Sequence, residues 1–253
     1  MILSLEHVSK NFGGLAALSE VSFGVGQGEI VGVIGPNGAG KTTLFNLITG
    51  VFSPTSGQIS FREHPIVGLR PHKVTELGIS RTFQNIRLFG HMTALENIMV
   101  GSHCRTHAGL WQGLWRTRGQ RAEELLIRKK SEELLELVGI ADERDTPAGS
   151  LPYGKQRRLE IARAMGADPE LLLLDEPTAG MNESETEDLR LLIKKIQAMQ
   201  KAVVLIEHDM HLVMNVCERL VILNFGRKIA EGLPEEIREN KDVIEAYLGR
   251  EEE

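Results

Sequence analysis

Short apolar runs separated by glycines occupy the first third of the chain. The runs ILSLEHV, VSFGV and EIVGVIG have strand-like composition, and the last is continuous enough for a strand buried on both faces. The stretch KTTLFNLITG then has helical spacing, and its helix is predicted to stop at Gly50 in the left-handed conformation. The run GQISF (57–61) returns to a strand pattern. We therefore expect a β-rich N-terminal region that already contains one strand–helix unit.

The periodicity changes in the middle of the chain and again after it. From about Gln84 to Gly149, the stretches TALENIMVG and RAEELLIRKKSEELLELVGI have helical spacing, the second with charges between leucines. Beyond them, the short apolar runs LLLLDE and AVVLIEH alternate with the helical stretches RLEIARAMGA and ETEDLRLLIKKIQAM. This alternation is typical of an α/β fold with a covered, largely parallel sheet. The pattern predicts that the first and last thirds share one core around an inserted helical lobe.

Composition narrows the class of protein. The chain has 253 residues, 42% hydrophobic and 25% charged, which is ordinary for a globular protein with a substantial core. A net charge of -6 counts against a dedicated nucleic-acid binder. Cys104 and Cys217 form no CxxC pair, which fits a reducing cytoplasm. No signal-like start and no long apolar run is present, so we expect neither a membrane span nor export.

The stretch GPNGAGKT (35–42) lies between a predicted strand and a predicted helix, and it fills the pattern GxxxxGK[ST]. A tight turn alone would not explain the lysine. Glycines let backbone N–H groups turn inward around a polyphosphate, and the following helix adds the positive end of its dipole. Lys41 would reach the β- and γ-phosphates of such a ligand, and the Thr42 hydroxyl would hold Mg²⁺. The residues predicted to bind the nucleotide here are Gly35, Pro36, Asn37, Gly38, Ala39, Gly40, Lys41, Thr42 and Thr43.

A second motif, LLLLDEP, begins with four leucines that have the pattern of a buried strand and continues with two acidic residues. Asp175 and Glu176 emerge at its end, which is where open α/β sheets place ligands. Asp175 can hold the hydrated Mg²⁺, and Glu176 can orient or deprotonate an attacking water. Adjacent acids at a strand end are also common as solvated turn residues, and the preceding phosphate-binding pattern favours the catalytic interpretation.

The stretch LPYGKQRRLEIARA (151–164) resembles the signature motif LSGGQ and its helical continuation in the nucleotide-binding subunits of ABC transporters. The resemblance covers most of the chain, in the family's order. KNFGG matches the aromatic A-loop through Phe12, and RTFQN matches the Q-loop through Gln84. AGMN (179–182) resembles the D-loop, and VLIEHDM resembles the switch region through His208. The segments FGGLAAL, ISRTFQNIRLF and the ending EGLPEEI…VIEAYLG resemble the LivG type, the ATPase subunit of branched-chain amino acid importers.

The resemblance implies the fold and its division. It implies a single ABC ATPase domain over residues 1–253, of the α/β P-loop NTPase class. Residues 1–84 and 150–253 would form a RecA-like core with an N-terminal antiparallel β region. Residues 85–149 would form the inserted helical subdomain.

The resemblance also implies roles for single residues. The implied catalytic residues are Gln84, Glu176 and His208, and the implied Mg²⁺ ligands are Thr42, Gln84 and Asp175. Phe12 would stack on adenine, since an aromatic face suits a purine, although a core role is the alternative. His208 would contact the γ-phosphate, although a histidine after an apolar strand is often structural. Tyr153 and Gly154 would contribute the signature contact.

The implied function is an ATPase that works in pairs, in which ATP on one subunit is covered by the signature of the other. Its partners would be membrane permeases, a homologous sister ATPase and, indirectly, a periplasmic substrate-binding protein. It would act peripherally at the cytoplasmic face of the inner membrane. The alternatives are a subunit for another cargo, such as exported lipid or lipopolysaccharide, and a soluble ABC ATPase that acts on ribosomes or DNA. One P-loop, no sustained heptads and an acidic balance count against the last.

Three positions depart from the family pattern. Pro152 replaces the signature serine and Tyr153 the first glycine, so the hydroxyl expected at the γ-phosphate is missing. Asn182 stands where the D-loop usually has aspartate.

Trp111 and Trp115 lie four residues apart, which fits an apolar helix face packed on its own lobe or a docking surface for a partner or lipid headgroups.

Overall fold

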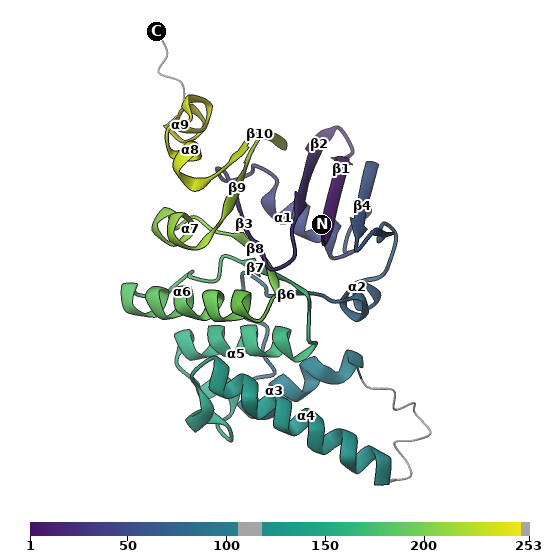
Figure 1. Ribbon diagram of the computed structural model, residues 1–253, viewed down its shortest axis with the longest axis vertical. Helices are drawn as coiled ribbons and strands as arrows, with labels where there is room; N and C mark the ends of the chain where they lie inside the picture. Colours follow the sequence, from purple (N-terminus) through teal and green to yellow (C-terminus); the bar gives the residue numbers. More distant parts are fainter. Residues whose placement is uncertain (106–117, 249–253) are drawn as a thin grey trace.

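The computed structural model describes residues 1–105 and 118–248. Two β-sheets and a layer of helices make up the fold (Figure 1). The smaller sheet is antiparallel, in the order β2-β1-β4-β5. Its strands are β1 (Leu3–Phe12), β2 (Leu15–Val25), β4 (Ser56–Phe61) and β5 (His64–Pro65). The predicted antiparallel N-terminal region and helical lobe are both present, so the predicted fold class is confirmed.

The larger sheet has the order β10-β9-β3-β8-β7-β6. Its pairs are parallel except β9 with β10. The strands are β3 (Ile30–Ile34), β6 (Ile79–Arg81), β7 (Leu171–Asp175), β8 (Ala202–Ile206), β9 (Arg219–Asn224) and β10 (Arg227–Gly232). Strands far apart in the sequence therefore lie side by side, and β3 is flanked by two strands from the last fifth of the chain.

Both faces of the larger sheet are buried, which explains why its strands contain consecutive apolar residues. Along β7, Leu171 and Leu173 point into the core shared with the antiparallel sheet, whereas Leu172 and Leu174 point into the core under the helices. Alternate side chains leave opposite faces of a strand, so both faces need apolar residues when both are covered. The run of four leucines is thus a consequence of its central position.

Helices cover both faces and extend into a lobe at one end (Figure 1). They are α1 (Lys41–Ile48), α2 (Pro71–Leu77), α3 (Ala94–Gly101), α4 (Arg118–Leu137), α5 (Tyr153–Gly166), α6 (Glu183–Ala198), α7 (Met210–Val216), α8 (Pro234–Arg238) and α9 (Lys241–Leu248). Short 3₁₀ turns span Ser102–Arg105, Ala141–Glu143 and Ala148–Ser150. As predicted, α1 is followed by Gly50 in the left-handed conformation, with φ of 72°. Within the described residues, no helix is long and apolar enough to cross a bilayer.

The helical lobe is built from α3, α4 and α5. Helix α5 follows residue 149 in the chain, yet it packs against both α3 and α4. The predicted limits of the lobe, 85–149, stay a prediction.

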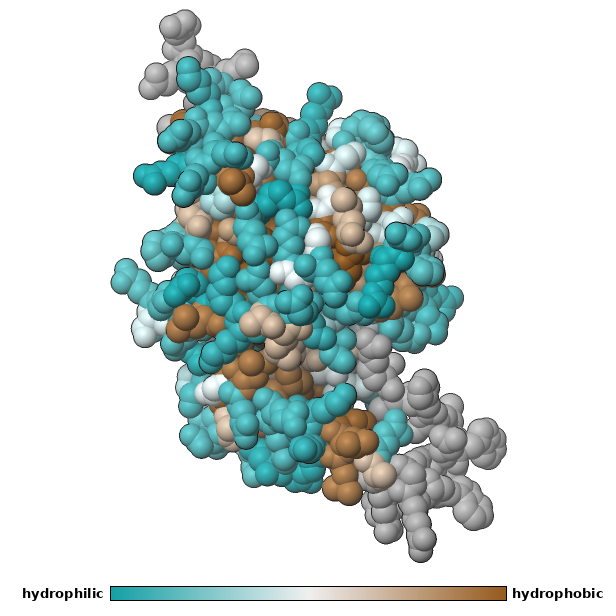
Figure 2. Space-filling model, in the orientation of Figure 1, coloured by the Kyte–Doolittle hydropathy of each residue, from teal (hydrophilic) through white to brown (hydrophobic). Residues whose placement is uncertain are grey.

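Trp111 and Trp115, for which a packed helix face or a docking surface was expected, lie outside the described residues. Figure 2 shows a largely hydrophilic face with hydrophobic patches, and α4 exposes Leu125 and Leu126.

Candidate functional site

Most of the predicted site residues follow the carboxyl ends of neighbouring strands in the larger sheet. The P-loop follows β3, His208 follows β8, Asp175 and Glu176 stand at the end of β7, and Gln84 follows β6. These four strands are consecutive neighbours in the sheet and run parallel, so their carboxyl ends meet. Ligands of open α/β sheets bind at this edge.

The P-loop is shaped by its backbone. Gly40 caps α1 in the left-handed region, with φ of 103°. A Cβ atom there would lie 2.7 Å from the carbonyl oxygen of Ala17, so a side chain is excluded by space as well as by conformation. The turn after β9 supports the loop from behind, since the N–H of Gly226 donates to the carbonyl of Ala39 at 3.0 Å. The loop therefore presents amides at the start of α1, the arrangement that suits an anion.

Lys41 is buried beneath this loop. Its ammonium donates to the carbonyl oxygens of Gly35 at 2.6 Å and Pro36 at 2.9 Å. Burial lowers the pKa of Lys41, and the carboxylates of Glu176 and Asp175 act in the opposite direction. The amine therefore lies where a phosphate oxygen could replace the two carbonyls.

Asp175 is held by an arginine that the sequence motifs did not single out. Asp175 is only 3% exposed, and its Oδ2 accepts a hydrogen bond from Arg81 at 2.7 Å. The same guanidinium donates to Asn46 on α1 at 2.7 Å and lies 5.4 Å and 5.3 Å from the ring centroids of Phe45 and Phe83. Arg81 therefore connects the P-loop helix, the end of β7 and the start of the Q-loop. Its place as the first residue of the RTFQN motif, three residues before Gln84, was the available signal in the sequence.

The three residues with an implied catalytic role lie in direct contact. Gln84 Nε2 donates to Glu176 Oε2 at 2.8 Å, and His208 Nε2 lies 2.8 Å from Glu176 Oε1. Glu176 has φ of 47°, an unusual backbone for a residue other than glycine, and its N–H donates to Ile206 on β8 at 2.9 Å. Both oxygens of one carboxylate are thus fixed in orientation, as a general base requires.

Glu207 is a second residue that the motifs missed. It is buried, and one oxygen accepts hydrogen bonds from the Thr178 N–H at 2.8 Å and its hydroxyl at 2.5 Å. The other oxygen accepts the His208 N–H at 2.8 Å. Glu207 therefore fixes the segment after Glu176 to the segment that carries His208. The acid–histidine pair EH after an apolar strand was the signal in the sequence.

The signature segment forms the start of α5. Pro152 is the residue that precedes the helix, and Tyr153 is half-exposed. A Cβ atom at Gly180 would lie 3.0 Å from the Tyr153 ring, so the D-loop packs on this ring. Asn182 caps α6, with its side chain accepting the Glu185 N–H at 3.0 Å and Glu185 accepting the Asn182 N–H at 3.0 Å. This box gives a structural reason for asparagine at the D-loop position.

Phe12 lies apart from these groups, at the tip of the β1–β2 hairpin. It is 41% exposed and meets Phe52 edge to face at 5.2 Å between centroids. The Lys10 ammonium lies 5.0 Å from the Phe12 ring centroid. An exposed aromatic face is compatible with stacking on a base, which stays a prediction.

The donor set for a metal is oxygen only. The predicted ligands offer a hydroxyl from Thr42, an amide oxygen from Gln84 and the second carboxylate oxygen of Asp175. Hard oxygen donors in small number suit Mg²⁺, which keeps several waters and is shared with phosphates. In the part of the chain that the structure describes, no cluster of histidine, cysteine and acidic side chains could hold a metal by itself.

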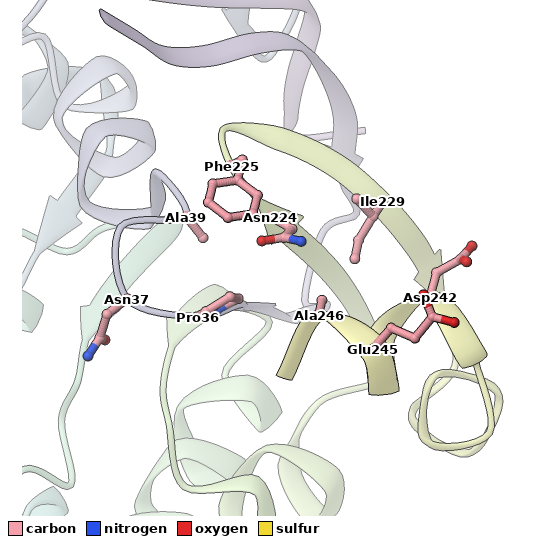
Figure 3. Close-up of a pocket in the computed structure, with 9 residues that line it drawn as sticks. All are labelled: Pro36, Asn37, Ala39, Asn224, Phe225, Ile229, Asp242, Glu245 and Ala246. Carbon is pink, nitrogen blue, oxygen red and sulfur yellow. The ribbon is translucent and has the colours of Figure 1, made fainter. Parts of the chain in front are cut away.

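A cavity of about 790 Å³ lies between the P-loop and the C-terminal segment, and Lys41 is not among its lining residues (Figure 3). Asp242 and Glu245 of α9 face it, opposite Pro36 and Ala39. None of the described residues that line it is basic. Phosphates are therefore expected on the Lys41 side of the loop.

Comparison with known families agrees with this geometry. Residues 18–179 match the family described as ABC transporter, and residues 227–253 match the family described as branched-chain amino acid ATP-binding cassette transporter. The high-affinity branched-chain amino acid transport ATP-binding protein BraF of Pseudomonas aeruginosa is 46% identical over 249 residues, which cover 98% of each chain. LivG of Escherichia coli K12, with the same description, is 44% identical over 98% of each chain.

Solved structures give the same picture. A nucleotide-free ATP-binding cassette from an ABC transporter matches with a TM-score of 0.86 and 31% identity, covering 98% of this chain and 99% of that one. A bacterial ABC transporter cassette solved as a dimer matches with a TM-score of 0.78 and 26% identity, covering 92% and 99%.

Proposed function

Because the chain belongs to the ABC transporter family, we propose that it is the ATP-hydrolysing subunit of a transporter that imports branched-chain amino acids. The family match makes the chain a nucleotide-binding ATPase. The cargo follows from the names of its relatives and from the match of its last 27 residues, 227–253, to the branched-chain amino acid family.

The observation that carries the hydrolytic role is the orientation of Glu176 by Gln84 and His208. In the proposed reaction Glu176 accepts a proton from the water that attacks the γ-phosphorus, while His208 contacts the γ-phosphate. The bond from the γ-phosphorus to the bridging oxygen of the β-phosphate breaks, and ADP leaves with that oxygen. Lys41 exchanges its two carbonyl partners for phosphate oxygens. Thr42, Gln84 and Asp175 would hold Mg²⁺, which would neutralise charge on the phosphates. Phe12 and Tyr153 complete the nucleotide contacts, Tyr153 toward the ATP of the paired subunit.

A groove beside the Q-loop supports a permease partner. A cavity of about 260 Å³ lies between α2, the end of β6, α3 and α5, and the exposed side chains of Phe89 and Val100 line it. Arg81, which binds Asp175, also lines it. An apolar segment of a permease seated here would contact the Q-loop side of the ATP site directly. We propose that the chain docks through this groove at the cytoplasmic face of a membrane.

The test is uptake of labelled leucine by proteoliposomes that contain the complete transporter, with permeases, sister ATPase and binding protein. We expect ATP-dependent uptake with the wild-type chain and none with Glu176→Gln. The matched control is Glu183→Gln, an exposed acid in the first turn of α6. Hydrolysis without leucine uptake would point to another cargo, such as a lipid, and absence of hydrolysis would contradict the ATPase assignment.

A further inference from the structure

One buried arginine connects the signature helix to the Q-loop. Arg157, one turn into α5, is 2% exposed. Its Nη1 donates to the carbonyl oxygen of Phe83 at 2.7 Å, and its Nη2 donates to that of Gln84. Its charge is paired with Glu160, 3.3 Å away on the same helix. The ion pair with Glu160 already neutralises the charge of Arg157 within one helix. The hydrogen bonds to the two carbonyls are additional, and they join α5 to a loop more than 70 residues earlier in the chain.

The Arg157 guanidinium also contacts Tyr153, a residue at which the signature departs from the family pattern. Arg157 Nη2 donates to the Tyr153 hydroxyl at 3.1 Å, and the guanidinium lies 5.5 Å from the Tyr153 ring centroid. The general family signature has glycine at this position, which offers no hydroxyl. Tyr153 therefore gives the signature a direct polar contact with the arginine that holds the Q-loop.

A continuous chain of contacts follows. Tyr153 binds Arg157, Arg157 binds the backbone of Gln84, and the Gln84 amide binds the carboxylate of Glu176. We propose that Tyr153 and Arg157 are positioning residues that transmit engagement of the signature by the paired subunit's ATP to Glu176 in this subunit's own site. This rests on the proposed function, in which two ATPases share their nucleotides. A charge-assisted hydrogen bond has a defined geometry, so a shift of Tyr153 is passed on to Gln84 rather than absorbed.

The variant that tests the relay is Tyr153→Phe, which removes one hydroxyl from a half-exposed side chain and leaves the ring on Gly180. We expect turnover of the complete transporter to fall about three- to tenfold, the range of one hydrogen bond. ATP affinity of the isolated full-length chain should stay within about twofold, because the variant leaves the P-loop untouched. The matched control is Arg158→Gln, the neighbouring arginine, which pairs with Asp188.

A double-mutant cycle with Gln84→Ala separates the relay from a merely structural role. If Tyr153 acts through Gln84, then adding Tyr153→Phe to Gln84→Ala should lower turnover no further. An equal fold-loss in both backgrounds would overturn the relay, as would wild-type turnover in Tyr153→Phe. Absence of hydrolysis in the wild type would overturn the proposed function and the relay together, whereas normal hydrolysis unaffected by Tyr153→Phe would overturn the relay alone.

Discussion

The P-loop and the signature region are built in different ways. The P-loop takes its shape mainly from the backbone of eight consecutive residues, with Gly40 in the left-handed conformation, and one long-range hydrogen bond from Gly226 to Ala39 closes it. The signature region is built from side chains, because Arg157 joins α5 to carbonyls more than 70 residues away. The first arrangement tolerates little change in the sequence, since only glycine fits. The second allows the signature itself to vary, as Pro152 and Tyr153 do, provided that the side-chain contacts are replaced.

The two regions meet at Glu176, so the largest effect is expected there. Glu176→Gln should slow ATP turnover about 10²- to 10⁴-fold, because the amide cannot accept the proton of the attacking water. ATP binding should persist, since Lys41 and the P-loop are unchanged. Steady-state hydrolysis and nucleotide titration of the same preparations measure the two quantities. Comparable turnover in variant and wild type would remove Glu176 from the chemistry.

A substitution at Arg81 tests whether long-range side-chain contacts also stabilise the part of the site near the P-loop, where Arg81 pairs with Asp175. Arg81→Met leaves Asp175 as an unpaired buried charge, and we expect the free energy of unfolding to fall by about 3–5 kcal/mol. The control Arg190→Met removes a more exposed pair with Glu187 and should leave the free energy of unfolding nearly unchanged, because water screens such pairs. Urea denaturation without nucleotide measures both. Equal losses would mean that the Arg81 pair is no more important to stability than a surface pair.

Substitutions of two P-loop glycines test how strongly ATP binding depends on the backbone conformation of the loop. Gly40→Ala adds a Cβ 2.7 Å from a carbonyl oxygen at φ of 103°, so ATP affinity should fall about 5- to 150-fold, the equivalent of 1–3 kcal/mol of strain. Gly38→Ala meets no atom within 4 Å and carries only the left-handed penalty, about 1–2 kcal/mol. Calorimetric titration ranks the two. A larger loss at Gly38 would show that loop mobility, rather than space, limits binding.

The same distinction explains what the sequence could predict. Strands β3, β7 and β8, the helix after the P-loop and the turn at Gly50 follow from local patterns, and the structure confirms them. The common edge that gathers Gln84, Glu176 and His208 also follows from strand ends in a parallel sheet. Their chemical roles stay predictions.

What could not be predicted depends on long-range side-chain contacts. Arginine and glutamate are frequent on surfaces, and only the fold shows that Arg81, Arg157 and Glu207 are directed inward onto specific partners. The departure at Tyr153 likewise had no explanation until its hydroxyl was seen beside Arg157. The helix that carries it begins at Tyr153, five residues before the predicted helical stretch, because the local pattern marks only the apolar part of the helix.

The position of β3 has a consequence for synthesis of the chain on the ribosome. Strand β3 pairs with β8 and β9, and the Gly226 N–H closes the P-loop through Ala39 while the Gly226 carbonyl accepts the Ser19 N–H at 2.8 Å. The phosphate-binding loop is therefore translated early but cannot take its final shape until residue 226 has left the exit tunnel. Pairings of such long sequence separation form late and slowly. ATP can stabilise only the folded state, so it gives the growing chain no protection. The strands β1, β2 and β4 can pair with one another early, whereas the apolar strand β3 must wait for almost the whole protein to be made.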